Sequence, residues 1–468
     1  MRAIIMGAGI GGLSLALLLA KKGFEVLVLE KLNQPGGRAR WFKVGEFSFD
    51  MGPSWYLMPE IFNSFFHEAG ESSYPITEVE PKVKIIKGKP LEREHESITF
   101  VSDLSNEDGP LEQYLLDTGY LYKVALNRFL YKELTLIDFL DRELILALKK
   151  FPILYTLDQF NRMYFKTDIM LKSMGFSSVF LGGSPYNIPA FYSIVNYAIF
   201  GKGVYYPKGG FAGYVTNLFE LCRKTGVEFK FGFNISKIKI NGNKVNCVGN
   251  DERCVEGDIF ISNMDYHYTE SVLPYDFRNV NYWSNKKVSP SAILAYIGAE
   301  GSINVPHHTV VINGEWRSHF DSIDNGMLPD LNNMSYYVSY RKATDDTLEG
   351  KDLVFLIPIS PNENITHNQA INYVNFVIKD FKEKTNSNFE IKYLRVYTPA
   401  DFKTDYNAYR GTAFGLAHTL TQTGPFRPPM QNKKLKNLYY VGQYTQPGIG
   451  VPMVTLSSMI LYRKIVEE

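Results

Sequence analysis

The sequence contains few of the residues from which metal centres and disulfide frameworks are built. Its 468 residues include three cysteines, at positions 222, 247 and 254, an odd number without CxxC spacing. This pattern predicts free thiols in a reducing cytoplasm. The eight histidines form no HExxH motif and no Cys/His cluster, and the adjacent His307 and His308 are expected to face opposite sides of a strand. The sequence therefore predicts no metal site.

Neither sign of charge dominates, and no apolar run is long enough to predict a membrane span. Lys+Arg 50 against Asp+Glu 49 leaves a net charge of +1, so no global basic field attracts nucleic acid. Residues 3–20 are uncharged and largely apolar, as in a secretion signal, but a small-residue cleavage site is missing and two lysines follow directly. With 45% hydrophobic residues over this length, we expect a globular protein of two domains.

The N-terminal segment carries a dinucleotide-binding pattern. The run AIIM predicts a buried strand, a helix follows, and EVLVLE predicts a second strand. Gly7, Gly9 and Gly12 stand between the first strand and the helix in GxGxxG spacing, and Glu30 closes the second strand. The glycines permit a tight turn, approach of a pyrophosphate and close helix–strand packing, while Glu30 can accept hydrogen bonds from ribose hydroxyls. Together these parts predict a Rossmann-type dinucleotide fold.

A second glycine motif distinguishes between classes of dinucleotide. Gly36, Gly37 and Arg38 follow shortly after the ribose acid, and the segment FSFDMGPSWY comes next. This arrangement resembles amine-oxidase-type flavoproteins, which have the glutathione-reductase-like FAD fold. In that superfamily the matching arginine lies against the FAD phosphates, a role that suits the fixed donors of the Arg38 guanidinium. No separate NAD(P) motif is visible, so we expect no nicotinamide requirement.

The C-terminal segment resembles a narrower family. Residues 411–454 contain G-x-A-F, F-R-P, N-L-Y-x-V-G and P-G-x-G-x-P in this order, as do bacterial-type phytoene desaturases, the carotenoid desaturases. Residues 49–56 and 181–211 match in order as well, whereas 100–170 and 276–400 match loosely. Family members commonly have His before the Pro-Gly, where this chain has Gln446, which cannot transfer protons near neutral pH.

The resemblance implies the fold class and the division of the chain. We expect an α/β protein in which a glutathione-reductase-like FAD-binding Rossmann domain is interleaved with an α+β substrate domain. The FAD-binding domain would comprise residues 1–95, 203–275 and 401–468, and the substrate domain residues 96–202 and 276–400. Within the latter, an amphipathic helix is expected at about 367–384.

The resemblance also implies which residues bind FAD. A backbone position at Ile235 would meet the adenine, the glycine ending the last strand would lie by the ribityl-phosphate, and the last helix would point its N-terminus at the flavin, where its dipole stabilises negative charge. The expected cofactor-binding residues are Gly7, Gly9, Gly11, Gly12, Glu30, Lys31, Gly37, Arg38, Gly52, Ile235, Gly442, Gly450, Val451, Pro452 and Met453.

The activity implied is FAD-dependent desaturation of a long apolar polyisoprenoid, of the phytoene or dehydrosqualene class, in carotenoid biosynthesis. A hydride would leave for the flavin and a proton would be lost, with oxygen or a quinone as final acceptor. The alternatives are a carotenoid isomerase, a terminal oxygenase, a retinol-saturase-like enzyme, an amine oxidase or a flavin-free protein that escorts prenylated proteins. Catalytic residues stay unassigned, because Asp50 is expected to cap a turn beside the flavin.

Residues 96–200 are expected to be helical and apolar. Ile137, Leu140, Leu144 and Leu148 would lie on one helical face, either as ordinary core or as a surface that contacts the membrane. The 31 Tyr and 32 Phe similarly indicate either a large core or an apolar substrate cavity. From the family we expect a cytoplasmic protein that associates peripherally with the membrane.

Overall fold

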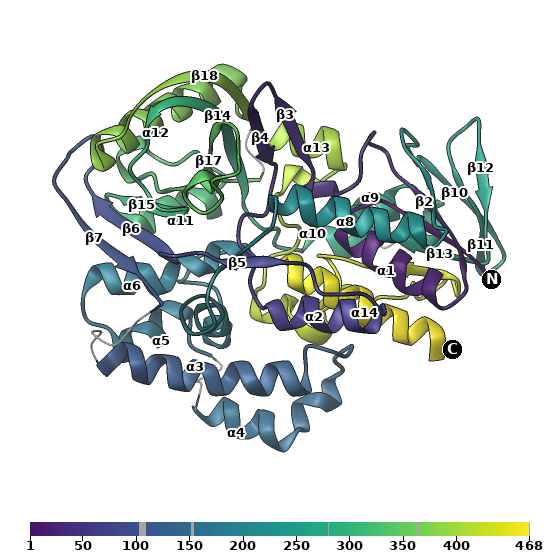
Figure 1. Cartoon of the computed structure of the whole chain (residues 1–468). Coiled ribbons are helices and arrows are strands. Elements are labelled where there is room, and N and C mark those ends of the chain that lie inside the picture. Colours follow the sequence, from purple (N-terminus) through teal and green to yellow (C-terminus); the bar gives the residue numbers. More distant parts are fainter. Residues whose placement is uncertain (103–108, 151–153, 279, 362–363, 468) are drawn as a thin grey trace.

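The first of the two larger sheets combines strands from the N-terminal, middle and C-terminal parts of the chain. The computed structural model describes residues 1–102, 109–150, 154–278, 280–361 and 364–467. Five parallel strands run side by side in the order β19 (Leu438–Tyr440), β13 (Ile259–Ser262), β1 (Arg2–Met6), β2 (Glu25–Leu29) and β9 (Glu228–Lys230). Figure 1 shows that both termini lie in this half of the molecule.

Both faces of this sheet are covered, which explains the uninterrupted apolar run of β1. Ala3 and Ile5 pack against helices, whereas Ile4 and Met6 pack on the opposite side. The helices are α1 (Ile10–Lys21), α2 (Pro59–Glu68), α8 (Gly210–Lys224) and α14 (Val451–Glu467). The opposite side carries an antiparallel meander of β10 (Lys237–Asn241), β11 (Lys244–Gly249) and β12 (Cys254–Glu256). Alternate side chains of a strand face opposite sides, so each face gains its own core.

A seven-stranded mixed sheet forms the second half, at the upper left of Figure 1. Its strands run in the order β18 (Asn388–Tyr397), β14 (Ser291–Ser302), β17 (Lys351–Ile359), β16 (Tyr336–Ser339), β15 (His308–Asn313), β6 (Val83–Gly88) and β7 (His95–Phe100). Helix α12 (His367–Thr385) packs Val374, Val377 and Phe381 on one face. This confirms the amphipathic helix expected at 367–384. By hydrogen bonding β6 belongs here, although the predicted division placed residues up to 95 with the nucleotide-binding part.

A helical layer lies below this sheet in Figure 1. It contains α3 (Gly109–Arg128), α4 (Arg142–Lys150), α5 (Leu157–Tyr164), α6 (Asp168–Gly175) and α7 (Ile194–Asn196). Shorter elements elsewhere are α9 (Tyr266–Ser271), α10 (Val280–Ser284), α11 (Trp316–Asp324), α13 (Pro399–Tyr406) and the strand pairs β3 (Trp41–Val44) with β4 (Phe47–Asp50) and β5 (Ile76–Glu78) with β8 (Tyr205–Pro207). Among the described residues, no helix is long and apolar enough to cross a membrane.

The predicted single apolar helix face over residues 137–148 is wrong. A 3₁₀ turn, η2 (Leu136–Leu140), ends before α4 begins at Arg142. Thr135 and Asp138 form a capping box on η2, and Asp141 accepts the N–H groups of Glu143 and Leu144, so local capping separates the two elements. Ile137 and Leu140 are 77% and 75% exposed, and the side chain of Leu148 lies outside the described part.

Two sequence expectations about cysteine and histidine are also corrected. Cys247 and Cys254 form a disulfide across neighbouring strands β11 and β12, with a Cα–Cα distance of 5.7 Å, whereas Cys222 is free and buried. A turn between neighbouring antiparallel strands can bring two cysteines within bridging distance without CxxC spacing, so the absence of that motif did not exclude a disulfide. His307 directly precedes the first residue of β15, so its side chain does not follow the alternation of side chains along the strand. The centroids of the His307 and His308 rings lie 4.2 Å apart. No group of metal-ligating side chains occurs in the described ranges.

A buried ion cluster joins the two halves. Asp50 ends β4 and accepts hydrogen bonds from the backbone N–H groups of Phe211 and Ala212, in the first turn of α8. Its Oδ2 atom also lies 3.1 Å from Nη1 of Arg341, and Nε of Arg341 lies 2.8 Å from Asp352 on β17. Asp50 therefore caps a helix and forms an ion pair. It is not free to act as a base, in agreement with the capping role expected for it.

Replacing Arg341 by methionine is expected to destabilise the protein strongly. The change leaves Asp50 and Asp352 buried without their cation, which costs about 3–5 kcal/mol in comparable buried pairs. Urea unfolding followed by tryptophan fluorescence measures the loss. Lys43→Met, which breaks the exposed pair with Glu349, is the control and should leave the unfolding midpoint unchanged. Equal midpoints for the two variants would contradict the importance of the cluster.

Candidate functional site

Two adjoining cavities lie between the halves. The smaller, of about 280 Å³, opens at the carboxyl ends of β1, β2 and β13, and the larger, of about 660 Å³, extends from it beneath the seven-stranded sheet towards the helical layer. Both cavities are lined by Gly52, Pro53, Leu356, Phe414, Ile449, Gly450 and Val451. We call these shared residues the junction. The carboxyl edge of a parallel sheet is the usual ligand site of such folds.

The glycine loop after β1 forms the floor of the smaller cavity. Gly7, Gly9 and Gly11 line it, and an isolated bridge pairs Gly9 with Gly36 of the second glycine motif. Gly12 lies behind this wall, where a Cβ atom would come within 2.2 Å of the Gly7 carbonyl oxygen. Its role is therefore the close helix–strand packing that the spacing predicted, and it does not line the cavity.

Glu30 holds the loop in place from the end of β2. Its Oε2 accepts the N–H of Ala8 at 2.7 Å and its Oε1 accepts the N–H of Leu32 at 2.8 Å. Burial raises the pKa of this carboxyl, and the two backbone N–H groups oppose the shift. Glu30 lines the cavity, so it both shapes the loop and presents oxygen atoms to a ligand.

Arg38 is the cation of the smaller cavity. Its Nε and Nη2 atoms are buried and find no hydrogen-bond acceptor among the described residues, while its guanidinium lies 5.2 Å from the centroid of the Tyr406 ring. A buried charge without acceptors is unfavourable unless a ligand supplies them. The cavity is therefore built to receive an anionic group beside Arg38.

Most of the residues predicted to bind a cofactor are brought together here. Those lining the smaller cavity are Gly7, Gly9, Gly11, Glu30, Lys31, Gly37, Arg38, Gly52, Ile235, Gly442, Gly450 and Val451. Pro452 and Met453 line only the larger cavity. Within the first group, the Lys31 ammonium donates to Thr404 O at 2.5 Å and to Asn407 Oδ1 at 2.9 Å, so it ties the cavity rim to the end of α13.

Sequence reasoning missed several lining residues. Asn263, directly after β13, lies among the glycines: a Cβ on Gly9 would come within 2.7 Å of its Nδ2, and one on Gly442 within 2.9 Å of its Oδ1. Its position at the carboxyl end of a parallel strand was a signal that could have found it. Asp405 and Tyr406 at the end of α13 also line the cavity, but no local pattern connects them to it.

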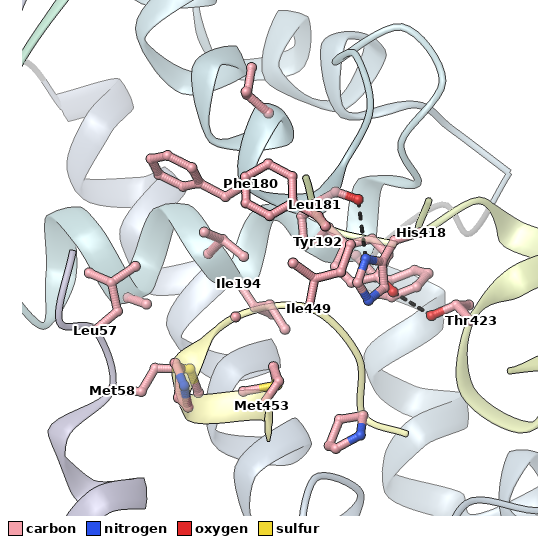
Figure 2. A pocket seen from close by; sticks show the side chains of 18 of the residues that line it. Leu57, Met58, Phe180, Leu181, Tyr192, Ile194, His418, Thr423, Ile449 and Met453 are labelled. Carbon is pink, nitrogen blue, oxygen red and sulfur yellow. Dashed lines mark hydrogen bonds between the residues drawn. The ribbon is translucent and has the colours of Figure 1, made fainter. Parts of the chain in front are cut away.

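The larger cavity is almost wholly apolar. Figure 2 shows Leu57, Met58, Phe180, Ile194, Ile449 and Met453 around it, contributed by segments distant in the sequence. At one wall His418 is hydrogen-bonded to the Leu181 carbonyl at 3.1 Å, and the Tyr192 hydroxyl is hydrogen-bonded to Thr423. Burial lowers the pKa of His418 well below its usual value, so this wall is neutral. Such a space suits a long hydrocarbon.

The glycine-rich loop before α14 separates the two cavities and is fixed by hydrogen bonds to Arg427 and Leu134. Arg427 donates to the backbone carbonyls of Gln443, Tyr444 and Thr445 at 2.6, 3.2 and 3.1 Å. The Gln446 amide exchanges two hydrogen bonds with the backbone of Leu134, at 2.8 and 3.0 Å. The position that is commonly His in carotenoid desaturases is thus a structural anchor in this chain.

Comparison with known proteins agrees with this architecture. The model of the family of flavin-containing amine oxidoreductases matches residues 10–459. The chain belongs to this family. It is 34% identical to a carotenoid 3,4-desaturase of Haloarcula japonica, over 99% of this chain and 98% of the relative. It is 30% identical to a zeta-carotene-forming phytoene desaturase of Myxococcus xanthus, over 99% and 93%. The predicted membership among carotenoid-desaturase-like flavoproteins is confirmed.

A solved structure supports the fold of the chain. An oxidoreductase from Methanosarcina mazei aligns over 100% of both chains with a TM-score of 0.67 at 19% identity. The expected α/β class with a glutathione-reductase-like Rossmann part is therefore confirmed, as is a flavin-dependent oxidoreductase. The smaller cavity fits a flavin nucleotide, because glycine backbone lines much of it and two buried guanidinium nitrogens of Arg38 have no hydrogen-bond acceptor among the described residues.

Replacing Arg38 by methionine is expected to weaken flavin retention by at least about tenfold, since each lost charge-assisted hydrogen bond contributes about 1.5–3 kcal/mol. Flavin absorbance per protein after gel filtration, followed by titration with added flavin, measures the change. Arg223→Met removes an exposed arginine of α8 that pairs with Glu220 and serves as the control. Full retention by the Arg38 variant would show that the guanidinium does not hold the cofactor.

Proposed function

We propose that the protein uses FAD to desaturate a long apolar polyisoprenoid of the phytoene or dehydrosqualene class, in carotenoid biosynthesis. The observation that carries the proposal is the apolar cavity of about 660 Å³ that meets the nucleotide cavity at a shared junction. A chain threaded through this cavity would bring its carbon atoms against the junction, where the flavin ring would lie. The full-length similarity to carotenoid desaturases supports the substrate class.

The residues of the smaller cavity suit FAD specifically. The N-terminus of α1 and the glycine loop would bind the pyrophosphate, Arg38 a phosphate, and Glu30 the ribose hydroxyls. The flavin, when bound, supplies a hydride acceptor. Ile235 and the N-terminal turn of α14 at Gly450–Val451 line the same cavity and would complete the site.

The residues that line the larger cavity determine the environment that a substrate would meet there. Hydrocarbon surface predominates in the larger cavity, whose charged lining residues Lys132 and Asp138 are paired with each other. Such a surface excludes water from a cationic carbon chain after hydride loss. Carotenoid isomerase, terminal oxygenase and retinol-saturase-like activities use the same kind of space and are the alternatives. A flavin-free escort protein is disfavoured, because Arg38 and the glycine loop would have no ligand to bind.

An anaerobic mixing experiment tests the proposal. Purified protein is mixed with phytoene or dehydrosqualene in liposomes, and the oxidised-flavin absorbance near ~450 nm is followed. We expect bleaching together with the growth of longer-wavelength polyene bands. A flavin that stays oxidised with both substrates would overturn desaturation of this class. Readmitting oxygen or adding a quinone then shows which of the two reoxidises the flavin.

We propose, further, that the protein takes up its substrate from a membrane surface while residing in the cytoplasm. Exposed apolar side chains from η2 and from the segment 420–426 line the larger cavity, namely Leu136, Phe139, Leu420 and Phe426, and Ile137 and Leu140 are exposed on the same η2 turn. We call these six residues the mouth patch. The two segments meet, since a Cβ on Gly424 would lie 4.0 Å from the Phe139 ring. An exposed apolar patch around an apolar cavity suits a lipid surface.

Replacing both Ile137 and Leu140 by serine is expected to reduce binding to phospholipid vesicles severalfold, because two largely exposed apolar side chains no longer enter the bilayer interface. Cosedimentation with vesicles measures the effect. Tyr275→Ser removes a side chain that is 76% exposed and lies far along the chain, between α9 and α10, and should leave binding unchanged. An equal loss in both variants, or none in either, would contradict the mouth patch as the membrane-binding surface.

A further inference from the structure

The proposed desaturation requires a group that accepts a proton, and the larger cavity holds one hydrogen-bonded chain that can do so. Ser54 Oγ lies 2.9 Å from the Tyr337 hydroxyl oxygen, which in turn lies 2.6 Å from Nδ1 of His308. Ser54 and Tyr337 are half-buried and line the cavity, whereas His308 is fully buried behind them. The three side chains therefore form a hydrogen-bonded path from the cavity surface into the protein interior.

The position of this chain coincides with the junction. Ser54 is two residues beyond Gly52 and directly follows Pro53, both of which line the two cavities. Tyr337 on β16 is paired with Leu356 on β17, another junction residue. Two hydroxyl groups, from two different segments, thus approach the place where a substrate chain would meet the flavin.

The surroundings of His308 suit it to the end of the chain. Burial lowers its pKa well below its usual value, with neighbouring His307 adding to the shift, so the imidazole is neutral at rest. In the tautomer that carries its hydrogen on Nε2, Nδ1 accepts the hydrogen bond of the Tyr337 hydroxyl. The Trp55 indole stacks on the ring with centroids 4.0 Å apart and an interplanar angle of 14°. The π face of an indole stabilises a cation, and would offset part of the cost of a transient imidazolium.

We propose that Ser54, Tyr337 and His308 form a proton relay that removes the proton in the desaturation proposed above. When bound, the flavin would supply the acceptor for a hydride from one C–H bond of the substrate. The neighbouring carbon then loses a proton, and the electron pair of its C–H bond becomes the new C=C bond. Ser54 Oγ takes this proton as its own passes to Tyr337 Oη and the tyrosine proton passes to His308 Nδ1. The imidazole gains one proton and both hydroxyls are restored.

A weak base is sufficient for this step. The carbon chain is cationic after hydride loss, so its neighbouring C–H bond is far more acidic than that of a neutral alkene. General-base assistance contributes typically about 10²–10⁴-fold, and a strongly acidic donor places the relay near the lower end. Asp50 cannot serve as the base instead, because it caps α8 and is paired with Arg341.

Single-turnover measurements test the relay in the flavin-loaded protein. Ser54→Ala and Tyr337→Phe are mixed anaerobically with phytoene or dehydrosqualene, and polyene formation is timed in H2O and in D2O. We expect both variants to form polyene about 100-fold more slowly than wild type. Wild type should be slowed in D2O, and this solvent isotope effect should disappear in the Tyr337 variant. Ser54→Thr retains a hydroxyl and should restore most of the rate.

Tyr114→Phe is the matched control. Tyr114 is a buried tyrosine of the helical layer whose hydroxyl is likewise hydrogen-bonded to two side chains, to Asn161 at 2.9 Å and from Asn196 at 2.7 Å. The Tyr114→Phe substitution removes a tyrosine hydroxyl, as Tyr337→Phe does, but from a hydrogen-bond network that does not line the cavity. Flavin content shows that each variant is folded.

The possible outcomes separate the relay from the reaction it serves. Wild type that fails to bleach with either substrate would overturn the proposed desaturation, and the relay with it. Active wild type with Ser54→Ala and Tyr337→Phe as fast as Tyr114→Phe would overturn the relay alone. So would variants that only bind substrate more weakly while keeping the maximal rate and the solvent isotope effect, since the hydroxyls would then serve binding.

Discussion

The buried ion pair between Asp50 and Arg341 is the contact on which the site geometry depends. Asp50 caps α8 on the nucleotide side, and Arg341 connects it to Asp352 on the seven-stranded sheet. Gly52 and Pro53 come directly after this fixed point and line both cavities. Because a buried charge tolerates little displacement from its partner, the cluster fixes β4 and the first turn of α8 relative to β17, close to the junction.

The C-terminal loop provides the opposite side of the same junction. Backbone rather than side chains must face a flat ligand there, so the loop cannot stabilise itself through a core of its own. Its hold comes from outside: Arg427 binds three successive carbonyls, and Gln446 binds the backbone of Leu134 in the helical layer. His418 packs behind Gly448, where a Cβ would come within 2.1 Å of its ring nitrogen. Nucleotide binding and the substrate wall are thereby coupled through one segment.

Local patterns predicted the nucleotide half well. AIIM, the glycine spacing and EVLVLE are contiguous, and each element packs against its sequence neighbours, so β1, α1 and β2 appear as expected. The hydrophobic pattern was less informative where helix caps or turns determine the local structure. Thr135, Asp138 and Asp141 divide the expected apolar helix, and a hairpin brings Cys247 to Cys254. Those outcomes depend on a few side-chain hydrogen bonds or on a turn, which hydrophobic periodicity does not register.

The amino-acid sequence by itself determined the family, the Rossmann half and twelve of the residues that surround the smaller cavity, because those features rest on backbone conformation and spacing within short segments. Only the tertiary structure decided how the second half meets it. Asn263 and Tyr406 reach the smaller cavity from separate segments. His308 and Tyr337 become neighbours through the pairing of β15 with β16, and Ser54 joins them from the segment that follows β4. Contacts between residues hundreds of positions apart leave no local pattern, since they follow from how the sheets pack.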